Sequence, residues 1–133
     1  MLDKSLSLKI NTIILGVIAV IDIIRGYMHT FNINYASANI ARIDPHPDAM
    51  YLLGVFGMSN FLTAFVYAII VWKAKHITPY ILLIIPFAYL VGIIGLRTED
   101  VQMQSEFNGQ YIMFGYFTIC LLTSLLYFTS KKQ

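Results

Sequence analysis

Four long apolar runs are the feature that most constrains this chain. They cover residues 10–31, 49–72, 78–96 and 110–129 of the 133-residue sequence. Each run is close to the roughly 20 residues that a helix needs to cross a hydrocarbon core of about 30 Å. The runs are continuously apolar, whereas a strand of a membrane barrel alternates over about 10 residues, so helices are expected. The sequence therefore predicts an all-α integral membrane protein, built as an antiparallel four-helix bundle.

The composition supports this class of protein and excludes others. Hydrophobic residues make up 58% of the chain and charged residues only 12%, against roughly 45–50% and 25% in soluble domains. Disordered, collagen-like, coiled-coil and disulfide-rich proteins need a more polar, repetitive or cysteine-rich composition. A net charge of +2 gives no case for a nucleic-acid partner, and the single cysteine, Cys120, permits no intramolecular disulfide. We expect one transmembrane domain over residues 1–133, with the lipid bilayer as its surroundings.

The basic residues predict the orientation of the chain. Lysines occur in three segments that share one side of the predicted membrane: Lys4 with Lys9, Lys73 with Lys75, and Lys131 with Lys132. The opposite side is mainly acidic. By the positive-inside rule, both termini are expected in the cytoplasm, in the inner membrane of a bacterial or archaeal cell. We interpret the first run as a permanent span rather than a cleaved signal peptide, because charged residues separate its core from the small residues at 36–38.

The two connections that flank the second helix differ in length. Residues 73–77 make a short turn and Pro79 suits a helix start, so the second and third helices should form an antiparallel hairpin. The outer loop, residues 32–48, mixes apolar and polar side chains in a pattern that a short interfacial helix would explain. It ends in Asp44-Pro45-His46-Pro47-Asp48. These donors suit a divalent ion, but the prolines favour an ordinary rigid turn, and no metal site is predicted.

Small residues at helical spacing predict where helices pack, because hydrophobicity does not drive helices together in lipid. The second span has one such line and the third has another: Gly57, Asn60, Ala64 and Ala68, then Ala88, Gly92 and Gly95. We expect both lines to face neighbouring helices.

Ionisable residues inside the first span mark the candidate site. Asp22, Arg25 and His29 recur at intervals of three and four and so share one helical face. An ionised side chain at bilayer depth costs about 2.5–3.5 kcal/mol and is kept mainly where it has a role. Counted at ~1.5 Å per residue, polar residues of the other spans fall in the same outer half of the membrane. These residues are Asn60, Tyr89, Arg97 and Tyr116.

We therefore hypothesise one outer-half pocket formed by all seven side chains. Two arginines face one aspartate there, so a small polar or anionic ligand or a lipid headgroup would fit. No catalytic residue is predicted, and a binding protein is favoured over an enzyme. A purely structural role stays equally open, because Asp22 and Arg25 can neutralise each other and Asn60 can bond between helices. His29 alone is more typical of a hydrogen-bonded residue near the headgroups than of a proton relay.

Three further functions remain open. The chain could be an accessory subunit whose glycines face a partner in a larger membrane complex. It could be a redox subunit that binds a quinone through Tyr89, Tyr116 and His29, and a quinone is the one cofactor left open. It could also be a homo-oligomeric channel, because four short helices enclose little volume alone. Walker, Rossmann, HExxH and GxSxG motifs are absent from the sequence.

The order of a few glycines and arginines adds a resemblance. Arg25-Gly26 is followed by an outer loop, a helix with Gly54, Gly57 and Asn60, and a helix ending Gly95-Leu96-Arg97. This layout resembles the small four-helix bacterial membrane proteins of the DoxX-like kind over most of the chain. The resemblance implies the four-helix architecture. Some members of that group are linked to quinone- or thiol-dependent redox systems. This chain has a single cysteine and so departs from the thiol-dependent members, and no catalytic residue is carried over.

Overall fold

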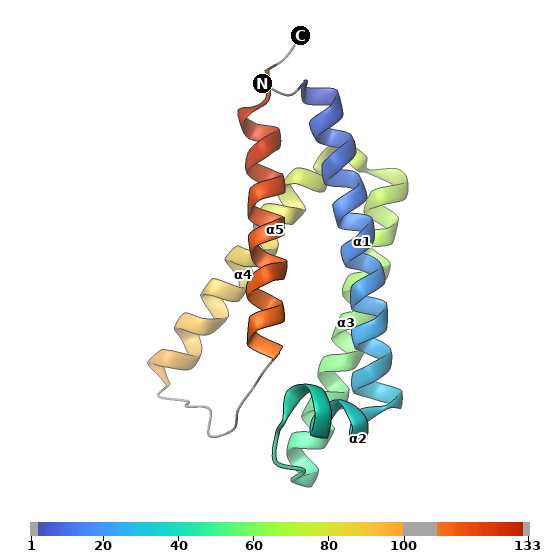
Figure 1. Ribbon diagram of the computed structural model, residues 1–133, viewed down its shortest axis with the longest axis vertical. Helices are drawn as coiled ribbons and strands as arrows, with labels where there is room; N and C mark the ends of the chain where they lie inside the picture. The colour runs from blue at the N-terminus through green and yellow to red at the C-terminus, as the bar shows by residue number, and fades with distance from the viewer. Residues whose placement is uncertain (1–2, 100–108, 132–133) are drawn as a thin grey trace.

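The computed structural model describes residues 3–99 and 109–131, and every regular element within these ranges is helical (Figure 1). In chain order the elements are α1 (Lys4–Phe31), α2 (Ile33–Tyr35), the π-helical η1 (Ala36–Ala41), α3 (Pro47–Lys73), the 3₁₀ turn η2 (Lys75–Ile77), α4 (Thr78–Thr98) and α5 (Gly109–Thr129). Four of them, α1, α3, α4 and α5, are long and apolar enough to cross a membrane. The all-helical class is thus confirmed, and the four helices identify a membrane protein.

The two ends of the molecule differ in character. Both chain termini lie at one end, where a single bridge pairs Asp3 with Lys131 (Figure 1). The opposite end carries α2 and η1, so the expected helix in the outer loop is present as two short helical segments. The prolines of this loop begin α3 at Pro47, and the backbone N–H of Asp48 donates to His46 Nδ1 at 3.3 Å. This turn therefore serves as a helix cap.

The helices do not form a symmetric bundle. α1 packs along the length of α3, whereas α4 packs against α5 and α1 and inclines away from α3 toward its far end (Figure 1). The turn between α3 and α4 is as short as expected, but the two helices do not lie along each other as a closed hairpin. The buried residues of α4 all precede Pro86, and the helix beyond Tyr89 is exposed. Only the first two turns of α4 are therefore anchored.

The hydrophobic core lies where α1, α4 and α5 meet. Its buried members are Leu15, Ile18, Leu82, Ile85 and Cys120. Cys120 is fully buried, as a small hydrophobe would be. Buried side-chain hydrogen bonds join the same helices nearer the termini: Asn11 Nδ2 donates to the Thr123 carbonyl at 3.0 Å and Ser124 Oγ to the Pro79 carbonyl at 2.8 Å. These bonds hold the terminal half of the molecule closed, while the opposite half is less tightly packed.

Glycines set the close approach of α1 and α3. A Cβ added to Gly57 would contact the side chain of Thr30 and lie 3.1 Å from the Gly26 carbonyl oxygen. Gly57, Asn60 and Ala64 are buried whereas Ala68 is exposed, so the line of residues predicted for the second span is confirmed as a packing face over its first three members. The line predicted for the third span is not. Gly92 and Gly95 have no atom within 4 Å of an added Cβ, and both lie on the exposed part of α4.

Candidate functional site

A buried ion pair lies between α1 and α3. The Asp22 side chain is only 5% exposed, and Arg25 Nη1 donates to Asp22 Oδ1 at 3.3 Å. Thr63 Oγ1 of α3 donates to the other carboxylate oxygen, Asp22 Oδ2, at 2.9 Å. The helical spacing of three residues brings the arginine beside the aspartate, and the close crossing of α1 and α3 brings the threonine. Both oxygens of the buried carboxylate therefore have donors, as a buried charge requires.

A second polar contact joins the same helices one turn closer to the far end. Asn60 Nδ2 of α3 lies 3.4 Å from His29 Nδ1. An amide nitrogen can only donate, so Nδ1 accepts and the ring proton lies on Nε2 of a neutral imidazole. The His29 ring also stacks on Phe56, with 5.5 Å between ring centroids, and the Arg25 guanidinium lies 5.4 Å from the same ring. Phe56 thus contacts and positions both Arg25 and His29.

A smaller cavity of about 270 Å³ opens beside these side chains. Its polar lining comes from Arg25, His29 and Tyr116, and the rest of its wall is apolar. Ile40 and Ala41 of η1 form part of this wall, so the outer segment between α1 and α3 helps to enclose it. Three of the seven predicted site residues, from α1 and α5, therefore meet in one space.

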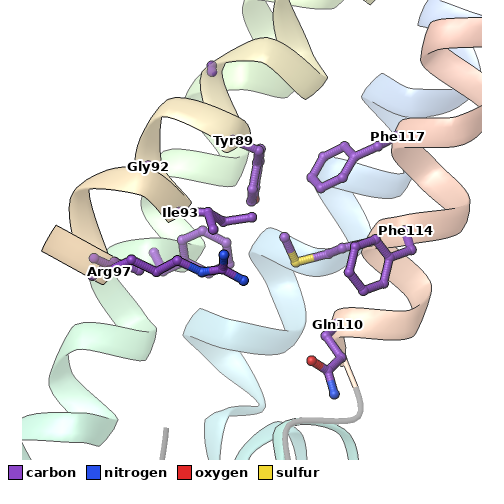
Figure 2. A pocket seen from close by; sticks show the side chains of 11 residues that line it. Tyr89, Gly92, Ile93, Arg97, Gln110, Phe114 and Phe117 are labelled. Atoms are coloured by element: carbon purple, nitrogen blue, oxygen red, sulfur yellow. The ribbon is translucent and has the colours of Figure 1, made fainter. Parts of the chain in front are cut away.

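A larger cavity of about 660 Å³ lies between α4 and α5. Figure 2 shows Arg97 extending from α4 into this space, with Gln110 and Phe114 opposite on α5. Deeper in the cavity, Tyr89 and Phe117 contact each other with 4.4 Å between ring centroids. Within the described ranges Arg97 has no ion pair or hydrogen bond from its guanidinium. The cavity therefore combines an apolar, aromatic interior with one cation.

The structure brings the predicted site residues together in part. Asp22 and Asn60 lie in the contact between α1 and α3, outside the linings of both cavities. Asp22 accepts a hydrogen bond from Arg25, and Asn60 donates one to His29. Tyr89 and Arg97 line the larger cavity and not the smaller one. The single pocket expected from the sequence is thus two adjoining cavities. The reason is that Phe56 and Met113 line both and stand between them.

Most lining residues of this region are absent from the sequence prediction, and four residues illustrate why. Phe56, Met113 and Gln110 line cavities, and Thr63 holds the Asp22 carboxylate. An aromatic or a methionine inside an apolar run carries no signal of its own. Thr63 could have been found, because it lies three residues after Asn60 on the face of α3 that turns toward α1.

Metal-binding side chains do not gather in the part of the chain that the structure describes: no three of His, Cys, Asp and Glu lie together there. His46 and Asp48 of the outer turn are 3.8 Å apart and highly exposed.

Comparison with known protein families, with characterised proteins and with solved structures finds no match for this chain.

Proposed function

We propose that this membrane protein binds an amphiphile with a negatively charged head in the cavity between α4 and α5. The charged head would lie at Arg97 and the apolar body among Tyr89, Phe114 and Phe117. This is the lipid-headgroup form of the ligand hypothesis reached from the sequence. A wholly polar small ligand is disfavoured, because most of the cavity wall is apolar.

The observation that carries this proposal is a cation in an apolar cavity. Arg97 reaches into the space between the helices, and the part of the chain described here offers it no acidic partner (Figure 2). A guanidinium in such surroundings is stabilised by an anionic group that binds it through two parallel hydrogen bonds. The volume of about 660 Å³ also lies within the roughly 300–1,000 Å³ usual for ligand cavities.

The proposed setting is a cell inner membrane with both termini in the cytoplasm. The lysine segments support it, since all three lie toward the end of the molecule that carries the termini (Figure 1). Both cavities would then lie in the outer half of the bilayer. The inclination of α4 away from α3 (Figure 1) would give a ligand a lateral route from the lipid between these helices.

The first prediction concerns Arg97 and uses hexadecanoate and its methyl ester as matched probes. In nanodiscs, the wild-type protein should bind hexadecanoate at least about tenfold more tightly than the ester, because an ionic hydrogen bond contributes about 1.5–3 kcal/mol. Arg97→Gln should remove this preference and Arg97→Lys should keep part of it. Native mass spectrometry measures the bound fraction of each probe.

Lys73→Gln provides the control, because Lys73 lies over the Trp72 ring at the end with the termini, far from the cavity. This variant should keep the preference for hexadecanoate. Equal wild-type affinities for acid and ester, or an unchanged preference in Arg97→Gln, would overturn the proposal. A quinone retained from native membranes in place of an anionic lipid would instead point to the redox alternative, with Arg97 and Gln110 donating to its carbonyl oxygens.

A second function is favoured by one further observation. Gly92, Gly95 and Gly115 all have open space where a Cβ would lie. Glycines at such positions suit the close approach of another helix. We propose, as the alternative, that α4 and α5 receive a helix of a partner subunit or of a second copy. The mass of the assembly in nanodiscs distinguishes this from a monomer that retains a lipid.

A further inference from the structure

Side chains, rather than backbone, separate the two cavities. Phe56 of α3 and Met113 of α5 line both spaces. Methionine is unbranched and adapts its shape readily, and Phe56 contacts His29 and Arg25 on one side but is 39% exposed. Rotation of these two side chains would join the cavities without moving a helix. One long ligand could then reach from Arg97 to the polar groups on α1.

The smaller cavity offers hydrogen bonds without net charge. Arg25 is paired with the buried carboxylate of Asp22, which Thr63 holds in place. The Asp22 contact uses one N–H group of the guanidinium, and four of its five donors remain. His29 accepts from Asn60 through Nδ1 and so keeps a donor at Nε2. This space suits an uncharged acceptor such as a hydroxyl or a carbonyl oxygen.

Charge counting over the two cavities limits the ligand further. Arg25 and Asp22 cancel, and His29 is neutral in this hydrogen-bonding arrangement. Among the described residues that line either cavity, Arg97 is the one cation without an acidic partner. The described lining of the joined cavities thus carries one positive charge. A ligand with one negative charge neutralises it, whereas a second negative charge would have no cation left to pair with among these lining residues.

We infer that one ligand occupies both cavities, an amphiphile with a single negative charge at Arg97 and an uncharged hydrogen-bonding group at Arg25, His29 and Tyr116. This inference rests on the proposed function and adds the charge and the second polar group of the ligand. Phe56 and Met113 select the ligand by its length, because only a ligand long enough to displace both side chains reaches the smaller cavity.

The test compares hexadecanoate with hydroxyhexadecanoates that carry the hydroxyl near the head, in the middle or near the end of the chain. In nanodiscs, one hydroxyl position should raise the affinity of the wild-type protein about tenfold over hexadecanoate, because its oxygen accepts from a charged donor. The other positions should give no gain. Hexadecyl phosphate, which carries more than one negative charge at neutral pH, should bind no more tightly than hexadecanoate.

Variants of the smaller cavity separate this inference from the proposed function. Arg25→Gln alone leaves Asp22 without its cation, so the double variant Asp22→Asn with Arg25→Gln keeps the site neutral. This double variant should lose the gain from the hydroxyl, so that hexadecanoate and every hydroxyhexadecanoate bind it with equal affinity. Phe56→Trp should also lose the gain, because a larger ring blocks the way between the cavities. Phe65→Ala, a change at an exposed aromatic outside both linings, should keep it.

The outcomes are distinguishable. Three results would overturn the inference of one ligand in both cavities. They are no gain in affinity from any hydroxyl position, a gain that survives in the double variant, and tighter binding of hexadecyl phosphate than of hexadecanoate. Arg97 can still bind hexadecanoate in each of those cases, and the proposed function then stands. If Arg97→Gln leaves hexadecanoate binding unchanged, the proposed function fails, and this inference fails with it.

Discussion

At the scale of single residues, Thr63 shows how a buried charge is kept in an apolar helix pair. Its hydroxyl donates to Asp22 Oδ2 at 2.9 Å across the contact between α1 and α3. Thr63→Val has nearly the same shape but leaves one carboxylate oxygen without that donor. We predict that it lowers the free energy of unfolding by about 1–3 kcal/mol, the range for hydrogen bonds to charged groups. Reversible unfolding in mixed micelles measures the change.

Thr118→Val is the matched control for Thr63→Val. The Thr118 hydroxyl donates to the Phe114 carbonyl of its own helix, on an exposed surface. This variant should change stability by less than about 0.5 kcal/mol, as is usual for surface positions. Equal effects of the two substitutions would mean that Thr63 has no special part in holding Asp22.

At the scale of elements, the pairing of α1 with α3 depends on glycine. A methyl group at Gly57 would meet the side chains of Thr30 and His29 and the Gly26 backbone, so the Thr30 side chain must turn away and the two helices must give by a few tenths of an ångström. We predict that Gly57→Ala costs about 1–3 kcal/mol of stability. Gly16→Ala, in open space on α1, should be neutral or stabilising by up to about 1 kcal/mol, because alanine favours the helix. The same unfolding experiment compares both, and a neutral Gly57→Ala would show that this contact is not close-packed.

The elements also show what the sequence could and could not predict. Each apolar run carries its own signal, so all four helices were predicted to within a few residues at most ends, although α1 begins six residues earlier, at Lys4. The packing face of α3 was predicted from Gly57, Asn60 and Ala64 because buried small residues recur at helical spacing. The same pattern on α4 was misleading at Gly92 and Gly95. Whether such a face is used depends on where neighbouring helices lie, which a local pattern does not contain, and Gly92 and Gly95 have open space beside them.

Part of the candidate site could be predicted in the same way. Counting depth along each helix placed Arg25, His29 and Tyr116 in the outer half of the membrane, and they line one cavity. The division between cavities could not be predicted, because Phe56 and Met113 are ordinary residues of apolar runs and act only through their position.

At the scale of the whole molecule, the orientation in the membrane decides from which leaflet the proposed ligand enters. The buried Cys120 is the only cysteine, so single cysteines introduced at exposed positions report on sidedness. Ser5 and Lys75 are exposed toward the end with the termini, and Asn39 is exposed on η1 at the other end (Figure 1). We predict that a membrane-impermeant maleimide labels Asn39→Cys in intact cells, and labels Ser5→Cys and Lys75→Cys only after the membrane is opened.

The parent protein should stay unlabelled in both conditions, because its one thiol is buried among apolar side chains. Labelling of Ser5→Cys in intact cells would reverse the orientation and place both cavities in the cytoplasmic half of the bilayer. An amphiphile entering between α3 and α4 would then come from the inner leaflet. The labelling pattern therefore determines which leaflet must supply the hexadecanoate probe, and adding the probe to that side alone should be sufficient for binding that depends on Arg97.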